Sequence, residues 1–359
     1  MKTHIIASNI ILLLSLFVLT NCSFGQQDKQ TVDNTFADSW EFKGIAVKDS
    51  GYTIWGTSPI IGDDGKVHLF VARWPGELKV VPGWRSHSEV AHYVGDKPEG
   101  PFKFSDVSLK GTGQETWDKF GAHNPTIQKV GNKYVLLYIG NTNPDRPYFP
   151  ANQRIGMAIS NSLYGPWEKV GDDGLILSTP TNKKYWNYKA FNGVNNPALL
   201  QHPNGGYYMY FKSAKGKMRS MGVAVAENIT GPYVQLPFSV TANDKMIEDG
   251  YAFMYNGKFN LLTTDNSGTI QDGGGILWTS DDGIKFSTYE KGYHRINQYT
   301  KVDMAKVAVH YGSKKRKYAK FERPQVLMID GEPKYLYVAS GVNIYGGDCT
   351  VSYVLKFKH

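Results

Sequence analysis

The stretch AHNPTIQKVGNKYVLLYIGNT (Ala122–Thr142) joins an Asn-Pro turn to two apolar runs that flank a Gly-Asn pair. Nearly the same pattern returns as VNNPALLQHPNGGYYMYFKSA (Val194–Ala214), with Asn-Gly-Gly between the runs. Two alternating apolar runs on either side of such a turn predict a β-hairpin. Because the pattern recurs, the chain has to be read first as a repeat protein.

Five segments share this pattern, each opening on a short polar phrase and continuing through a hairpin. The phrases are Thr57-Ser58-Pro59, His123-Asn124-Pro125, Asn195-Asn196-Pro197, Glu248-Asp249-Gly250 and Glu322-Arg323-Pro324. Three units also end on a Gly-Pro-aromatic marker that follows a further apolar run, at Gly100, Gly165 and Gly231. Four short strands per unit, repeated five times, predict an all-β, five-bladed β-propeller with four-stranded antiparallel blades around a central pocket.

The innermost strand of each blade lines the axis of a propeller, so the five phrases should converge there. We expect equivalent inner-strand positions for the residues Ser58, Asn124, Asn196, Asp249 and Arg323. We also expect the stretch FADSWEFKGIAV (Phe36–Val47) to supply a strand that closes the ring, since closure removes exposed sheet edges.

The first 22 residues have the features of an export signal: a Lys near the start and a long apolar run. The run ends in Leu19-Thr20-Asn21-Cys22, which resembles a bacterial lipobox, with Asn21 in place of a small residue. We therefore expect a lipoprotein-type signal peptide over 1–22, a polar tether over 23–35 and the catalytic propeller over 36–359. The protein would be an exported lipoprotein, outer-membrane or periplasmic, anchored through Cys22. Ordinary cleavage after Gly25, giving a soluble periplasmic or secreted form, is the alternative.

Composition narrows the range of partners. The chain has 359 residues, a net charge of +8 and two cysteines, Cys22 and Cys349. Lipidation of Cys22 would leave no intramolecular disulfide. Export argues against nucleic acid and favours an acidic polysaccharide as the partner of the positive charge. The sequence has no compact His/Cys/Asp spacing of the kind that binds zinc, so we expect no metal or cofactor, with a structural calcium at the axis left open.

The hairpins and Gly-Pro-Trp endings resemble those of five-bladed glycoside hydrolases related to families 43, 32 and 117, over roughly Trp40 to Phe357. In family 43, this resemblance implies a Glu that opens blade four as the general acid, the position of Glu248. The family's base, an Asp before the first-blade proline, is replaced by Ser58. The Asp that tunes the acid, before the third-blade proline, is replaced by Asn196. The family mechanism therefore cannot be carried over whole.

Glycoside hydrolysis needs a proton donor and a base or nucleophile on opposite sides of the scissile bond. Glu248 and Glu322, on neighbouring blades, are our candidate pair, with Asp249 beside them. His123, on blade two, is a candidate proton carrier. The candidate substrate-binding residues at the axis are Trp55, Ser58, Asn124, Asn195, Asn196 and Arg323.

A second candidate cluster lies in WRSHSEVAHY (Trp84–Tyr93). If the preceding loop folds over the channel, Arg85, His87 and Glu89 reach the substrate, and Glu89 replaces the missing base. The alternative is an ordinary solvated loop.

Three functions fit these residues. The first is an exported, exo-acting glycoside hydrolase that releases sugars from acidic or sulfated oligosaccharides, since Arg side chains suit such anions. The second is a polysaccharide lyase, in which a His or Tyr abstracts a proton beside a uronate carboxylate. The third is a non-catalytic glycan-binding lipoprotein. In each, the partner is an oligosaccharide or polysaccharide, and the membrane is met only through the lipid anchor.

Overall fold

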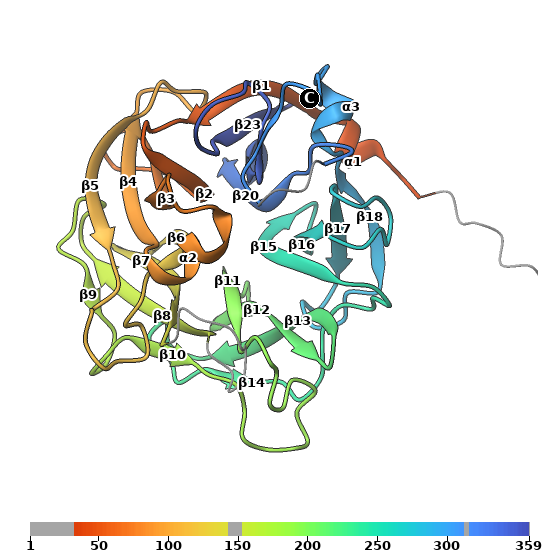
Figure 1. Cartoon of the computed structure of the whole chain (residues 1–359). Helices are drawn as coiled ribbons and strands as arrows, with labels where there is room; N and C mark the ends of the chain where they lie inside the picture. Colours follow the sequence, from red (N-terminus) through yellow and green to blue (C-terminus); the bar gives the residue numbers. More distant parts are fainter. Residues whose placement is uncertain (1–31, 143–152, 312–315, 359) are drawn as a thin grey trace, which may run out of the picture. The chain divides into compact units, whose positions relative to one another are not determined.

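Five four-stranded antiparallel sheets stand like blades around one axis in the computed structural model (Figure 1). The structure describes residues 32–142, 153–311 and 316–358. The predicted signal peptide, Cys22 and most of the tether lie outside the described residues. The predicted all-β, five-bladed β-propeller is confirmed.

In the first four blades the strands run outward from the axis in chain order, and in blade five the N-terminal strand β1 is added on the outside of β23. Blade one contains β2 (Tyr52–Ile61), β3 (Val67–Pro75), β4 (Glu89–Gly95) and β5 (Lys103–Leu109). Blade two contains β6 (His123–Val130), β7 (Lys133–Asn141), β8 (Gln153–Ser160) and β10 (Leu175–Leu177), with β9 (Glu168–Lys169) beside β8. Blade three contains β11 (Asn195–Gln201), β12 (Tyr207–Lys215), β13 (Met218–Ala226) and β14 (Val234–Gln235). Blade four contains β15 (Ile247–Tyr255), β16 (Lys258–Asp265), β17 (Gly275–Ser280) and β18 (Thr288–Tyr293). Blade five contains β20 (Glu322–Ile329), β21 (Glu332–Ala339), β23 (Ser352–Phe357) and β1 (Trp40–Val47).

The ring is closed by β1, the outermost strand of blade five. It pairs antiparallel with β23, with Trp40 opposite Phe357. The predicted closing strand is thus confirmed, although its first residues form a short helix, α1 (Thr35–Asp38). The N-terminal part of the propeller is therefore joined to its C-terminal strand by a backbone ladder, and β1 covers the outer edge of β23.

The core lies between the blades, where the faces of neighbouring sheets pack on each other. One cluster joins Ile54 and Leu69 of blade one to Tyr337 and Val354 of blade five, all nearly inaccessible to solvent. The alternation of apolar residues along each strand therefore serves two interfaces, one on each side of the blade.

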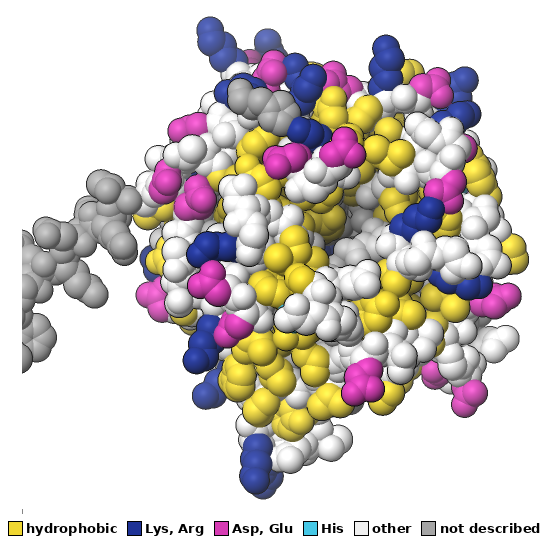
Figure 2. Space-filling model, turned by 180° about the vertical axis from the view of Figure 1, so that it is seen from behind, with side chains coloured by type: hydrophobic (Ala, Val, Ile, Leu, Met, Phe, Trp, Pro, Cys, Tyr) yellow, Lys and Arg dark blue, Asp and Glu magenta, His cyan; other side chains and the backbone are white. Residues whose placement is uncertain are grey.

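The connections add little regular structure. They contain α2 (Val80–Ser86) in blade one, α3 (Ile296–Tyr299) after blade four, and the two-stranded pairing of β19 (Ala308–Val309) with β22 (Val342–Asn343). Among the described residues, none of the helices has the length and apolar character needed to cross a membrane. On the face opposite to that in Figure 1, hydrophobic side chains form several patches separated by polar surface (Figure 2).

Every inner strand has a bulge at its opening phrase, where the pairing register shifts. The second residue of each bulge has a left-handed backbone: Gly56 (φ 57°), Asn124 (48°), Asn196 (52°), Asp249 (61°) and Arg323 (55°). The predicted equivalence is confirmed for four positions and wrong for Ser58. In blades two, three and five the left-handed residue directly precedes the proline, whereas in blade one Gly56 lies three positions before Pro59. Gly56 therefore holds the equivalent position.

Ring closure depends on Trp40, which is 2% exposed. Its ring meets Phe357 at 4.8 Å and Phe36 at 5.5 Å between centroids, and its Nε1 donates to the Gly292 carbonyl at 3.0 Å. We expect Trp40→Ala to lower the free energy of unfolding by about 3–5 kcal/mol, as for other buried Trp residues. Urea denaturation measures this loss. Phe238→Ala, at a residue 46% exposed, is the control and should cost far less; equal losses would contradict the role of Trp40 in closure.

Candidate active site

A pocket of about 290 Å³ opens where the five inner strands begin. Five aromatic side chains lie in its walls: Trp55, Trp74, Trp84, Phe191 and Tyr311. The charged residues that line it are Arg85, Lys212, Arg219, Glu248, Asp249 and Glu322. The polar residues that line it are His123, Asn124, Gln153, Asn192, Asn196 and Asn266. A concave site with aromatic walls and a few converging charges is what a small ligand requires.

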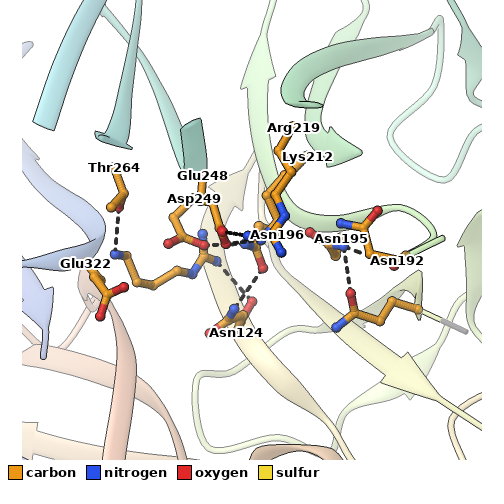
Figure 3. A network of polar contacts seen from close by, with 12 residues as sticks. Asn124, Asn192, Asn195, Asn196, Lys212, Arg219, Glu248, Asp249, Thr264 and Glu322 are labelled. Carbon is orange, nitrogen blue, oxygen red and sulfur yellow. Dashed lines mark hydrogen bonds and ion pairs between the residues drawn. The ribbon is translucent and has the colours of Figure 1, made fainter. Parts of the chain in front are cut away.

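The five bulges explain why these side chains meet. The first residues of the bulges are Trp55, His123, Asn195, Glu248 and Glu322, which occupy equivalent register positions. All but Asn195 line the pocket. Asn195 instead donates from Nδ2 to Gln153 Oε1 at 2.7 Å and to the Asn192 carbonyl at 3.2 Å (Figure 3). It therefore orients two residues of the wall and does not line it.

Glu248 is held by two cations from blade three (Figure 3). Lys212 Nζ donates to Oε2, and Arg219 Nη1 donates to Oε1. Burial alone would raise the pKa of Glu248, but Lys212 and Arg219 outweigh it and lower that pKa to about 2. Glu248 is therefore a carboxylate at neutral pH. This differs from the sequence prediction that it is the protonated acid.

Glu322 has the opposite protonation behaviour. Burial, together with the nearby charges of Asp249 and Glu248, raises the pKa of Glu322 well above its ordinary value. The Tyr311 hydroxyl donates a hydrogen bond to Glu322 Oε2. Glu322 is thus the carboxyl group of this pocket suited to carry a proton near neutral pH.

Asp249 lies deeper, in a chain of side-chain hydrogen bonds across the axis (Figure 3). Asn124 Nδ2 donates to Asn196 Oδ1 at 2.7 Å, and Asn196 Nδ2 donates to Asp249 Oδ1. Burial and Glu248 raise the pKa of Asp249, against the opposing effect of Lys212. Asn124 and Asn196 therefore connect blades two, three and four at the bottom of the pocket.

Two residues that were predicted to contact the substrate, Arg323 and Ser58, do not line the pocket. Arg323 is fully buried, and its Nη2 donates to the carbonyls of Asn124 (3.0 Å) and Pro125 (3.3 Å). Its side chain occupies the space over Gly56, where an added Cβ would come within 3.3 Å of Arg323 Cγ. Burial lowers the pKa of Arg323 to about 10, which leaves it charged. Its predicted role in substrate binding is wrong, because it does not reach the pocket.

Ser58 is the second of these contacts. It is buried, donates from Oγ to Gln325 Oε1 at 3.1 Å, and accepts from the Ile127 amide at 3.1 Å. It joins blades one, two and five beneath the pocket. Its predicted contact with the substrate is therefore also wrong.

His123 lines the pocket as a neutral ring. Its Nδ1 lies 2.9 Å from Ser88 Oγ, and it stacks on Trp84 at 5.2 Å between centroids. Burial, with the charges of Arg323 and Lys212, lowers the pKa of His123 to about 3. A ring with so low a pKa is a weak base at neutral pH.

The loop before β4 does fold over the channel, as α2, but it delivers only Arg85 among the three predicted residues. His87 is exposed, with Nδ1 2.7 Å from Ser86 Oγ. Glu89 accepts from Arg73 Nε at 2.9 Å, outside the pocket. His87 and Glu89 are thus wrong as pocket residues, because α2 ends at Ser86 and the chain then enters β4, away from the axis.

Sequence reasoning missed Lys212, Arg219 and Tyr311. Lys212 had a detectable signal, because it is a lysine inside the apolar run YYMYFKSA (Tyr207–Ala214). No sequence signal pointed to Arg219 or Tyr311. Arg219 follows a turn and Tyr311 lies in a connection, where polar residues are common. Across the described ranges, no group of three or more His, Cys, Asp or Glu side chains is arranged to hold a metal ion. Lys212 and Arg219 each form an ion pair with one oxygen of Glu248.

No protein-family model matches the sequence, and none of the curated proteins compared with it matches. Solved structures do match. Zg3597, a family 117 glycoside hydrolase of the marine bacterium Zobellia galactanivorans, is 15% identical, with 89% of this chain and 90% of that chain covered and a TM-score of 0.61. CoXyl43, a β-xylosidase/α-arabinofuranosidase from a compost metagenome, is 14% identical (89% and 96% covered, TM-score 0.59). The arabinanase Arb43A of Bacillus subtilis is 12% identical (87% and 96% covered, TM-score 0.55). At these identities the likeness shows a shared fold, and the resemblance to the five-bladed glycoside hydrolases is confirmed at that level.

Proposed function

We propose that the protein is an exported, exo-acting glycoside hydrolase that releases sugars from acidic or sulfated oligosaccharides. One observation carries the proposal: Glu322 and Glu248 open neighbouring inner strands and have pKa values shifted in opposite directions. A pair of carboxyls separated in this way supplies an acid and an ionised partner at the same pH. The glycoside hydrolases among the structural neighbours support a glycosidase as the class of enzyme.

In this mechanism Glu322 donates its proton to the glycosidic oxygen as the bond to the leaving sugar breaks. Glu248, ionised, stabilises the positive charge that develops on the sugar ring. A water oxygen then bonds to the anomeric carbon, and the proton that the water loses passes to the Glu322 carboxylate, which restores the acid. Lys212 and Arg219 hold Glu248 in this charged state. The aromatic side chains of the pocket offer flat surfaces to the sugar ring.

The form and charge of the pocket support the choice of substrate. A pocket on the propeller axis, in contrast to an open groove, accepts the end of a sugar chain. Arg85, Lys212 and Arg219 all line it. Among the carboxyls, Glu248 has a lowered pKa, while the pKa values of Asp249 and Glu322 are raised. The excess of positive charge favours a carboxylate- or sulfate-bearing sugar.

The lyase alternative needs a base that removes a carbon-bound proton. His123, with its pKa lowered to about 3, is poorly suited to that task. The low pKa of His123 therefore argues against this residue as the base of a lyase. Binding without reaction is the third possibility, and the analysis of products by mass separates it from both.

Mass analysis after incubation with a panel of acidic and neutral oligosaccharides should find products with one added water. We expect Glu322→Gln to reduce turnover by about a hundredfold, in line with the loss of a general acid, with the fold intact. Glu332→Gln, in the next strand of the same blade and outside the pocket, is the matched control. An unsaturated product identifies a lyase, an unchanged glycan identifies a binding protein, and near-normal turnover of Glu322→Gln excludes Glu322 as the donor.

The protonation of Glu248 gives a separate prediction. Its lowered pKa places the acid limb of the kcat/KM profile at low pH, and activity should be lost as the pH falls through that pKa. We expect Lys212→Met to move this limb toward neutral pH, because removing the cation raises the pKa of the carboxylate. Lys215→Met, at the exposed end of the same strand, should leave the limb in place. An acid limb that Lys212→Met does not move would exclude Glu248 as the ionised partner.

For location, we propose a lipid anchor on Cys22, supported by the lipobox-like sequence Leu19–Cys22. A clickable fatty-acid probe should label the protein produced in a bacterial host with lipoprotein processing, and Cys22→Ser should abolish the label. Cys349→Ser, at the buried second cysteine, is the control that should keep it. An unlabelled parent protein in the soluble periplasmic fraction would contradict the anchor.

A further inference from the structure

Tyr311 lies in the connection that follows β19, yet its backbone is well anchored. Val309 pairs with Val342, and the next amide, that of His310, donates to the Gly341 carbonyl at 3.0 Å. The residue before Tyr311 is thus tied to the segment that links β21 to β22. A side chain carried at this point starts from a defined place although no strand contains it.

The ring of Tyr311 is confined on several sides. It lies against Gly341, where an added Cβ would come within 1.5 Å of Tyr311 Cε2. Trp55 meets it edge-on at 6.1 Å between centroids and 85° between planes. The Arg316 guanidinium carbon lies 4.4 Å from its centroid. Glycine at 341 is required because any side chain there would occupy the position of the ring.

The confined ring brings its hydroxyl to the carboxyl of Glu322, and both residues line the pocket. The hydroxyl donates to Oε2, so this oxygen serves as an acceptor. In the protonated form of Glu322 the acidic hydrogen then belongs on Oε1, the oxygen that Tyr311 does not occupy.

We propose that Tyr311 is a positioning residue for Glu322: it fixes the carboxyl group and assigns the transferable proton to Oε1. The inference rests on the proposed function for the use of that proton, but the contact itself does not. A hydrogen bond donated to a carboxyl oxygen stabilises the ionised form more than the neutral form. Tyr311 therefore limits how far burial and the neighbouring carboxylates raise the pKa of Glu322.

Tyr311→Phe keeps the ring and removes this hydrogen bond. We expect kcat to fall about tenfold or more, and the basic limb of kcat/KM to move to higher pH by about one pH unit, because the acid then keeps its proton longer. Tyr335→Phe is the matched control. Its hydroxyl, in the same blade, lies 3.5 Å from the exposed Glu99, away from the pocket, and the substitution should change neither quantity.

A readout without substrate tests the contact separately. The full chain is produced with glutamate labelled with carbon-13 at the side-chain carboxyl carbon, and Glu322→Gln identifies the signal of Glu322. The pH titration of this signal should have a higher midpoint in Tyr311→Phe than in the parent protein and in Tyr335→Phe. An unchanged or lower midpoint overturns the inference.

The two kinds of failure are distinguishable. If the parent protein adds water to no oligosaccharide in the panel, the proposed function fails, and the titration still decides whether Tyr311 controls the proton of Glu322. If hydrolysis is found but Tyr311→Phe lowers kcat without moving either the basic limb or the titration midpoint, Tyr311 only supports the pocket wall and the inference is wrong.

Discussion

The left-handed residue in each inner strand is the constraint on which the site depends. A regular strand directs successive side chains to alternate faces, toward the two neighbouring blades, so none would point along the axis. The bulge breaks this alternation once per blade, and five bulges at the same height bring Trp55, His123, Glu248 and Glu322 to one pocket. Such backbone is costly for residues other than glycine. In four of the five blades a residue other than glycine has this left-handed backbone. The surrounding fold therefore imposes the conformation on the residue.

The charges around the pocket give two chemically identical carboxyl groups, Glu248 and Glu322, opposite pKa shifts. Glu248 and Glu322 occupy equivalent positions on adjacent blades, but only Glu248 meets the two cations of blade three, Lys212 and Arg219. The charge of Glu248 in turn contributes to the raised pKa of Glu322. Lys212 also acts directly on Glu322 and lowers its pKa, but burial and the neighbouring carboxylates outweigh this effect. The resemblance to family 43 implied that blade four carries the acid, whereas in this chain the surroundings favour blade five.

Much of the fold was predictable because its determinants are local. Asn-Gly and Asp-Gly turns between alternating apolar runs define hairpins. Few known folds are compatible with five such units in succession. The site was less predictable because it depends on register and on non-local contacts. Ser58 was misplaced because the sequence phrases were aligned on their prolines, whereas the equivalent backbone positions are set by the bulges. In blade one these two alignments give different residues. Arg323 was assigned to the substrate, although its guanidinium is buried against the Asn124 and Pro125 carbonyls of blade two, with its side chain close to Gly56.

The same physical argument explains how a shared fold can coexist with such low sequence identity. The bulges and blade interfaces require backbone geometry and apolar alternation, which many sequences satisfy. The chemistry needs only a few side chains at the openings of the strands, and each can change without disturbing the blades. Arg323 shows how far such change can go: a long cation at an axial position is accommodated by carbonyls of blade two and by the glycine of blade one. Arg323 therefore links blade five to blade two, while Trp55, His123, Glu248 and Glu322 line the pocket.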